Sequence, residues 1–180
     1  MFIEKIISGG EIGVGQAALT AAFSNGLKTG GVIRKGFKIP EWLSFAEEYN
    51  LIEGESEDIN ESIWKNVSMS EGTLRISHWF DEEKENSRLE AIKHYNKPYM
   101  DTLIFAVNKK EYLVGRQPDE VISWVIQNKI KILNIDGNSE EIAPGMQDTI
   151  FVFLDRIFKF NKNNVSENGE VKTTGGIRNP

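Results

Sequence analysis

Four glycines lie within seven residues near the start of the chain, in the stretch IISGGEIGVGQAAL at residues 6–19. An apolar run precedes these glycines, and small helix-forming residues follow them. Glycines between a strand and a helix let the backbone approach a ligand closely, and the N–H groups at the helix start favour an anion. The stretch therefore predicts a ligand-binding loop. The alternative is that the glycines only make a tight turn and let the helix pack on a sheet.

Two familiar phosphate-binding sequences do not match this loop. A P-loop ends in Gly-Lys-Ser/Thr, whereas Gly15 is followed here by Gln16 and Ala17. A dinucleotide fingerprint requires an acidic residue near the end of the second strand, where this chain has Arg34 and Lys35. The sequence thus argues against P-loop nucleotide hydrolysis and against a nicotinamide-dependent dehydrogenase.

Glu11 is the carboxylate inside the glycine loop. It would repel a phosphate but could accept a hydrogen bond from a base or a ribose. His78 follows an expected strand and is next to Trp79, so it either faces a ligand or packs as a loop histidine. The two histidines are sixteen positions apart in a chain without cysteine, so no metal site is predicted. No Ser/His/Asp set can be assembled, and the catalytic residues, if any, are unknown.

The composition limits the possible partners and location. The 180 residues carry a formal net charge of −6, which argues against nucleic-acid binding. The absence of cysteine excludes disulfides and a thiol nucleophile. No apolar run approaches the ~20 residues that a membrane span needs, and the apolar patch at the N-terminus is too short for a signal peptide. We expect a cytoplasmic protein that binds neither nucleic acid nor membrane.

Hydrophobic periodicity predicts alternating strands and helices. This alternation is typical of an α/β fold, and we expect a single domain with a Rossmann-like, mostly parallel sheet and helices on both faces. Residues 1–160 would form the domain, and 161–180 a polar C-terminal tail. Strands are expected at 2–7, 29–33, 73–77, 99–107 and 130–135, and helices at 15–25, 41–49, 81–95, from Pro118 onward, and at 147–159.

Two surfaces of this domain can also be anticipated. The acidic stretch 47–61 contains no Lys or Arg and reads as a solvated face. In the last helix, Phe151, Phe153 and Phe158 exceed one apolar face, which predicts an interface in a homo-oligomer.

The stretch from Ile7 to Leu19 resembles the ISGGQTGVDRAAL signature of the "putative molybdenum carrier" proteins. These are Rossmann-like domains related to the lonely-guy phosphoribohydrolases and the DNA-processing protein A group. Further motifs follow in the family's order across residues 2–154. They are Thr29-Gly30-Gly31 with Lys35-Gly36, then Ile39-Pro40, Trp64-Lys65-Asn66-Val67 with Ser70-Glu71-Gly72-Thr73-Leu74, Lys97-Pro98-Tyr99, and Leu133-Asn134-Ile135 with Ser139, Pro144 and Gly145.

Departures from the family pattern fall in the ligand loops. The family's Thr, Asp and Arg of the first loop are Ile12, Gly15 and Gln16 here, which removes a carboxylate and a phosphate clamp. Its second glycine-rich loop should fall near residues 86–87, where this chain reads DEEKENSRLEAI without a glycine. There, Glu82, Glu83 and Glu85 would repel a phosphate. The cations that could compensate are Arg34, Lys35, Arg75 and Arg88.

The resemblance implies binding of a nucleotide, a nucleotide-derived small molecule or a molybdenum-cofactor-like ligand at the glycine loop, and we expect no catalysis there. The first alternative is a phosphoribohydrolase-like enzyme that cleaves the N-glycosidic bond of a nucleoside monophosphate. The second is a scaffold or oligomer-forming protein with a vestigial pocket. The expected ligand-binding residues are Ser8, Gly9, Gly10, Glu11, Gly13, Val14, Gln16, Gly30, Gly31, Lys35, Asn66 and His78.

Overall fold

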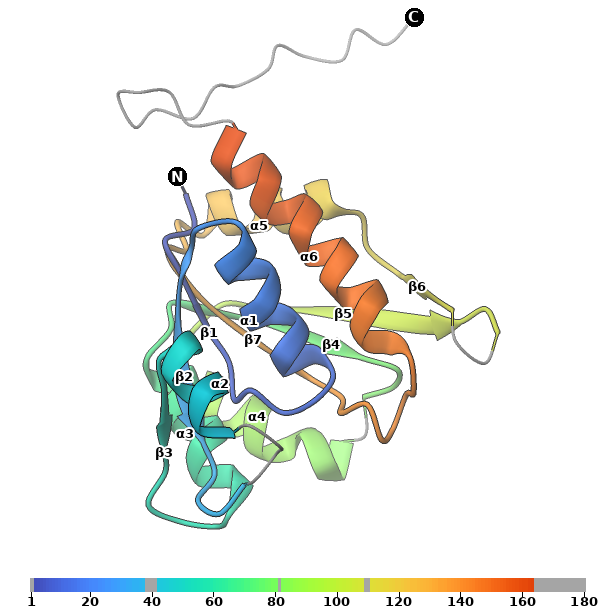
Figure 1. The fold of residues 1–180 in the computed structure, drawn as a ribbon. Coiled ribbons are helices and arrows are strands. Elements are labelled where there is room, and N and C mark those ends of the chain that lie inside the picture. Colours follow the sequence, from blue (N-terminus) through green and yellow to red (C-terminus); the bar gives the residue numbers. More distant parts are fainter. Residues whose placement is uncertain (1, 38–41, 81, 109–110, 164–180) are drawn as a thin grey trace, which may run out of the picture.

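A computed structural model describes residues 2–37, 42–80, 82–108 and 111–163. Within these residues a seven-stranded sheet has the order β3-β2-β1-β7-β4-β5-β6 (Figure 1). Neighbouring strands are parallel except for β5 and β6, which are antiparallel. The strands are β1 (Lys5–Ile7), β2 (Lys28–Ile33), β3 (Leu51–Glu53), β4 (Gly72–Ser77), β5 (Tyr99–Ala106), β6 (Tyr112–Val114) and β7 (Ile132–Gly137).

Helices lie on both faces of this sheet, which confirms the predicted Rossmann-like α/β architecture. Helices α1, α5 and α6 contribute to the main apolar core on one face. Helices α3 and α4 pack against each other on the opposite face, and α2 packs near β3 (Figure 1). The helices are α1 (Val14–Ser24), α2 (Trp42–Tyr49), α3 (Ile59–Ser68), α4 (Glu82–His94), α5 (Pro118–Gln127) and α6 (Met146–Asn163).

The two faces of the sheet differ in chemistry because side chains alternate along each strand. On the face under α1 and α6, Leu74 and its register partner Ile135 are buried in the main core. On the other face the next positions along the same strands are polar. There Thr73 aligns with Asn134, and Arg75 aligns with Asp136. The second face therefore carries the charged groups that the sheet places near its carboxyl edge.

Several predicted boundaries were wrong. Strand β1 begins at Lys5 rather than at residue 2, because the N–H groups of Phe2 and Ile3 donate to Asn161 Oδ1 at 2.9 Å. Strands β3 and β6 were not anticipated, and each has only three residues. Helix α3 was not anticipated either, and it begins at Ile59, where the Asp58 side chain accepts from Asn60 N at 3.0 Å. Strand β7 runs two residues past Ile135, to Gly137.

The predicted oligomer surface on the last helix was also wrong. Phe153 and Phe158 are buried, and Phe151 packs half-buried against the same core. Helix α6 packs against both α1 and α5, so it needs apolar residues on more than one side. It also continues to Asn163, whereas residues 164–180 of the predicted tail lie outside the described residues.

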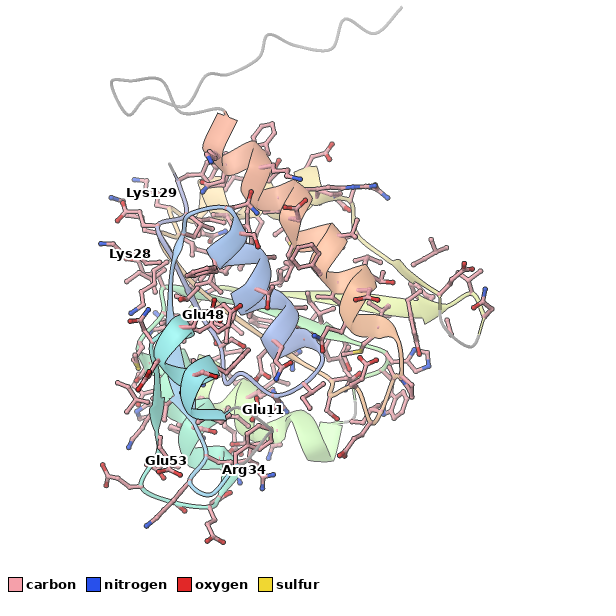
Figure 2. The ribbon with its side chains drawn as sticks, in the orientation of Figure 1. Glu11, Lys28, Arg34, Glu48, Glu53 and Lys129 are labelled. Carbon is pink, nitrogen blue, oxygen red and sulfur yellow. The ribbon has the colours of Figure 1, made fainter. Side chains whose placement is uncertain are left out.

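The solvated acidic stretch is confirmed, because its carboxylates are exposed apart from the half-buried Glu61. Figure 2 labels two of them, Glu48 and Glu53. The matched Ile39-Pro40 pair and the side chains of Glu82, Glu83 and Glu85 lie outside the described residues. None of the described helices combines the length and apolar character required to cross a membrane.

Candidate ligand-binding site

The glycine loop, residues 8–13, connects β1 to α1 at the carboxyl edge of the parallel strands. Three N–H groups at the start of α1 have acceptors within the chain. Gly13 N donates to Gln147 Oε1 at 3.1 Å, and Val14 N donates to the Asn138 carbonyl at 3.2 Å. Gln16 N donates to the carbonyl of Glu11 at 3.0 Å. These three N–H groups are therefore engaged within the protein rather than directed to an external anion.

N–H groups at the start of a second helix at the same edge, α6, also have acceptors within the chain. The loop between β7 and α6 covers the glycine loop, with Glu140 N donating to the Ile12 carbonyl at 2.8 Å. The Glu140 carboxylate then accepts from Gly145 N and from Gln147 N at the beginning of α6. A carboxylate of the chain thus occupies the position that a bound anion would take at this helix.

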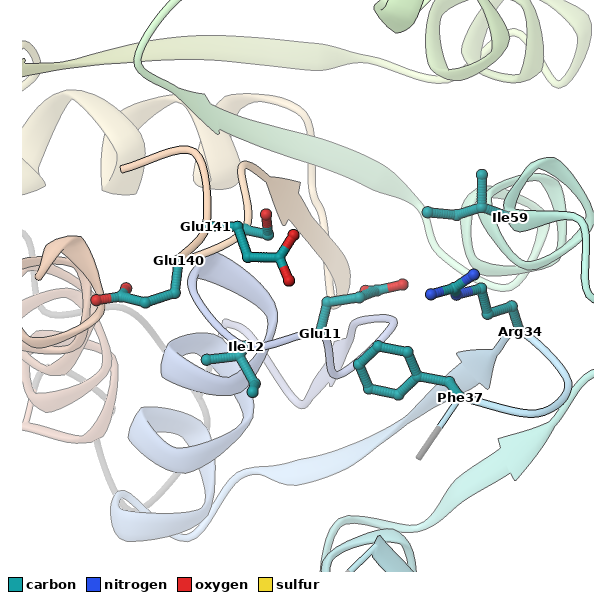
Figure 3. A pocket seen from close by; sticks show the side chains of 8 residues that line it. Glu11, Ile12, Arg34, Phe37, Ile59, Glu140 and Glu141 are labelled. Atoms are coloured by element: carbon teal, nitrogen blue, oxygen red, sulfur yellow. The ribbon is translucent and has the colours of Figure 1, made fainter. Parts of the chain in front are cut away.

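A pocket of about 560 Å³ lies beside the two loops, within the size range of small-molecule sites. Figure 3 shows the Glu11 carboxylate pointing toward the Arg34 guanidinium, with the Phe37 ring beside them. The pocket thus presents an acceptor, a cation and an aromatic face. Its lining residues are Glu11, Ile12, Arg34, Phe37, Ile59, Ser139, Glu140 and Glu141.

Glu11 is half-buried in the wall of this pocket. Burial raises the pKa of the Glu11 carboxyl, and the nearby Asp136 carboxylate raises this pKa further. The guanidinium groups of Arg88 and Arg34 lower it. A β-carbon on Gly9 would lie 2.5 Å from Glu11 Oε2, so the absence of a side chain at Gly9 leaves the space that the Glu11 carboxyl occupies.

Arg88 and Asp136 form an ion pair behind Glu11. Arg88 Nε lies 2.5 Å from Asp136 Oδ2, and Arg88 Nη2 donates to Asp136 Oδ1 at 3.2 Å. The same Oδ1 accepts from Gly137 N at 2.7 Å. Arg88 comes from α4, close to the position where the family pattern would place its second glycine-rich loop. The pair sets the charge around Glu11 without lining the pocket.

Several predicted residues are built into the scaffold next to this pocket. Ser8 is buried beneath the start of α1, and its Oγ has no hydrogen-bond partner among the described residues. Gly30 and Gly31 lie within β2, in agreement with the strand predicted at 29–33. A β-carbon on Gly31 would lie 1.9 Å from the Ser8 carbonyl oxygen, and its φ of +151° also favours glycine. This second glycine pair therefore lets β2 approach the end of β1.

The pocket lining does not include three other predicted residues, Asn66, Lys35 and His78. The Asn66 side chain accepts from Val32 N at 2.6 Å and donates to the Val32 carbonyl at 2.8 Å, fastening α3 to β2. Lys35 is exposed, and its neighbour Arg34 lines the pocket instead. His78 Nδ1 lies 3.1 Å from the Ile104 carbonyl, and its ring packs edge-on against Trp79.

The structure therefore brings Glu11 to the pocket together with residues that sequence reasoning missed. Phe37 and Ile59 carried no local signal, because they reach the pocket from separate segments. Asp136 directly follows the strand predicted at 130–135, and no role was predicted for it. Among the described residues, no group of three or more His, Cys, Asp or Glu side chains is arranged to hold a metal ion.

The fold is that of a Rossmann-like α/β domain, and the pocket lies at the carboxyl edge of its parallel sheet, where such folds bind ligands. Residues 6–158 match the model of the circularly permutated YpsA SLOG family, and the chain belongs to that family. The crystal structure of a "putative molybdenum carrier protein" from Syntrophus aciditrophicus is similar, with a TM-score of 0.68 and 28% identity over 87% of this chain and 94% of that one. An isoflavone reductase structure aligns with a TM-score of 0.41 and 19% identity, over 71% of this chain and 43% of that one. No curated protein matches the chain.

Proposed function

We propose that the chain binds a flat heterocyclic ligand with an anionic substituent, such as a nucleotide or a pterin-type cofactor, and does not transform it. The observation that carries this proposal is the placement of Glu11 and Arg34 toward each other beside the Phe37 ring (Figure 3). A carboxyl group can pair with amino or hydroxyl groups of a base or ribose. A guanidinium can bind a phosphate, and an aromatic ring can stack on a heterocycle.

A small free oxyanion fits the same residues poorly. The pocket wall carries Glu11, Glu140 and Glu141, and carboxylates repel phosphate and molybdate alike. The three N–H groups of α1 described above are already bonded within the chain. In this proposal the protein recognises the ligand mainly by its heterocycle. The anionic group of the ligand binds Arg34 and adds a second contact.

Isothermal titration calorimetry with five probes tests this proposal: GMP, guanosine, a pterin, inorganic phosphate and molybdate. We expect GMP to bind about 10-fold more tightly than guanosine, because a charge-assisted hydrogen bond to Arg34 is worth roughly 1.5 kcal/mol. Phosphate and molybdate should give no measurable binding. Binding of either oxyanion as tight as that of GMP would contradict the proposal, as would no binding of GMP, guanosine or a pterin.

Two adjacent residues offer a matched pair of variants. Arg34→Gln should remove the preference for GMP over guanosine while leaving guanosine binding unchanged. Lys35→Gln removes the same charge one residue away, on an exposed side chain that does not line the pocket, and should keep the preference. Equal effects of the two variants would show that the preference reflects the general surface charge rather than Arg34.

The environment of Glu11 favours one second candidate, an N-glycosidase acting on nucleoside monophosphates. A carboxyl with a raised pKa suits a general acid. Water would add to C1′ while the C1′–N bond breaks and the electron pair of that bond passes to the base nitrogen. Glu11 would donate a proton to this nitrogen and then take up the proton that the added water releases. Chromatography of nucleoside monophosphates incubated with the protein would detect free base and ribose phosphate. Release that is lost in Glu11→Gln would establish this candidate, and its absence in a protein that binds GMP would exclude it for that substrate.

A further inference from the structure

The sheet face at the β5–β6 edge carries a row of exposed apolar side chains. Residues on β5 alternate, so that Thr102 and Ile104 are buried while Leu103 and Phe105 are exposed. Leu113 on β6 is the register partner of Phe105 and shares its face. It is 63% exposed. The members of this apolar face are Tyr99, Leu103, Phe105, Val107 and Leu113.

No described helix shields these side chains, unlike those on the opposite face of the same strands. There, Tyr112 and Val114 pack against the main core, which includes α6. In Figure 1 the β5–β6 hairpin extends to one side of the helical layers. The molecule therefore has one covered face and one open face at this edge.

The apolar face is hollowed next to its most exposed side chain. A pocket of about 380 Å³ is lined by Phe80, Leu103 and Phe105, with Asp101, Gly115 and Arg116 at its polar side. The Phe105 ring lies over Gly115, where a β-carbon would come within 2.9 Å of Cε2. A leucine and a hollow on one surface can interlock with the hollow and leucine of an identical copy across a two-fold axis.

We propose that this apolar face is the interface of a homodimer, in which two copies pack their β5–β6 faces together and Leu113 of each enters the hollow of the other. The area supports a second copy as the occupant. The five side chains expose about 500 Å² if a full side chain exposes ~200 Å². That is close to the apolar share, about 65% for homodimers, of the ~800 Å² that each partner contributes to a standard interface.

The charges at the border of this face also favour a second copy. Asp101 and Arg116 are both partly exposed and carry opposite charges, and each also has a partner within the chain, Arg75 for Asp101 and Glu120 for Arg116. A surface with both signs at its rim can match itself when rotated by 180°, because the acid of one copy meets the base of the other. A strongly basic or acidic partner would leave one of the two rim charges facing a like charge.

Sedimentation velocity on the full chain tests the dimer. We expect a concentration-dependent species with twice the 20.4 kDa mass of the chain. Leu113→Asp places a charge in the proposed interface and should weaken dimerisation about 10-fold or more. The leucine is exposed in the single chain, so a circular dichroism melt should show that this variant still folds. A protein that stays monomeric at 100 µM would overturn the proposal.

Ile52 provides a matched control, because it is an exposed apolar residue on β3, the opposite edge strand of the sheet. It is 62% exposed, almost as exposed as Leu113. Ile52→Asp should leave the dimer unchanged, and an equal loss in both variants would place the interface elsewhere. The chain has no cysteine, so Leu113→Cys and Ile52→Cys can each carry one spin label. Double electron–electron resonance should give the shorter intermolecular distance at position 113, and the reverse order would exclude this face.

Discussion

Two arginine–aspartate pairs lie on the same face of the sheet. Arg75 on β4 donates to Asp101 on β5, with Nε–Oδ1 at 2.7 Å and Nη2–Oδ2 at 2.5 Å. Arg88 on α4 binds Asp136 on β7, and Asp136 is in turn the register partner of Arg75. The two pairs have the same chemistry and are neighbours, but their surroundings give them different roles.

The first pair belongs to the scaffold. The Arg75 side chain is only 3% exposed, and its guanidinium packs 4.7 Å from the Phe80 ring centre and 5.4 Å from that of Tyr99. The second pair is more open, with side-chain exposures of 14% for Arg88 and 21% for Asp136, and both of its charges act on the pKa of Glu11. Four cations were considered as substitutes for the family's loop arginine, and of these only Arg34 lines the pocket. Arg88 acts on the site by lowering the pKa of Glu11.

Breaking the Arg75 pair should have the largest effect. Arg75→Met leaves Asp101 without its main cation and should lower the free energy of unfolding by about 3 kcal/mol, as expected for a pair buried on one side. Urea denaturation measures this change. Arg116→Met, which removes a half-exposed arginine nearby, should cost under about 1 kcal/mol and serves as the control. Similar losses in both variants would mean that Arg75 is no more structural than its exposed neighbour.

Breaking the Arg88 pair should cost less stability and should change the site. Asp136 keeps its hydrogen bond from Gly137 N, so Arg88→Met should lower the free energy of unfolding by about 1–2 kcal/mol. Loss of this cation should also raise the pKa of Glu11 further. Urea denaturation and carboxyl-carbon NMR titration measure the two effects. If the pKa of Glu11 falls or does not move in this variant, the Arg88–Asp136 pair does not control the titration of Glu11 as proposed.

Removing one charge without changing side-chain shape sharpens the comparison. Asp136→Asn should lower the pKa of Glu11, because a like charge next to it disappears. The matched variant Asp101→Asn alters the scaffold pair and should leave the Glu11 titration where it is. The same NMR titration reads both variants, and an equal change in both would contradict the division of roles.

The smallest effect is the dependence of stability on pH. The folded state raises the pKa of Glu11, so this carboxyl binds its proton more tightly when folded than when unfolded. Its contribution is fully present below the unfolded pKa near 4.5 and is lost as the pH rises through the folded value. Glu11→Gln should therefore raise the melting temperature relative to the native chain more at pH 8 than at pH 5. A difference that is constant across this range would show that Glu11 does not titrate in this way.

The parts of the fold that depend on neighbouring residues could be predicted from sequence. The apolar run before Gly9 and the alanine-rich helix after Gly13 gave the first strand, loop and helix in the right order. Strands β3 and β6 were missed because three residues are too few to show a period of two. The phenylalanines of α6 were misread as an interface, since a helix packed against two others looks much like one with an exposed apolar face.

The site was predictable only in part, because it is assembled from distant segments. Glu11 was identified as an unusual carboxylate in a glycine loop, and Arg34 as one of several possible cations. Phe37, Ile59 and Glu141 reach the pocket from three other places in the chain. The resemblance marked Asn66 as a motif residue, yet its amide pairs with the backbone of β2, a role that no local pattern reveals.

Asn161 has a consequence for how the chain can be cut and rejoined. Its side chain accepts from Phe2 N and Ile3 N and donates to the Ile3 carbonyl at 3.0 Å, so the segment just before the first strand lies beside the last turns of α6. A domain whose first and last elements touch can be closed by a short linker and opened elsewhere without rearranging its strands. The same packing, reached from different starting points along the sequence, is what the word "permutated" in the family's name describes.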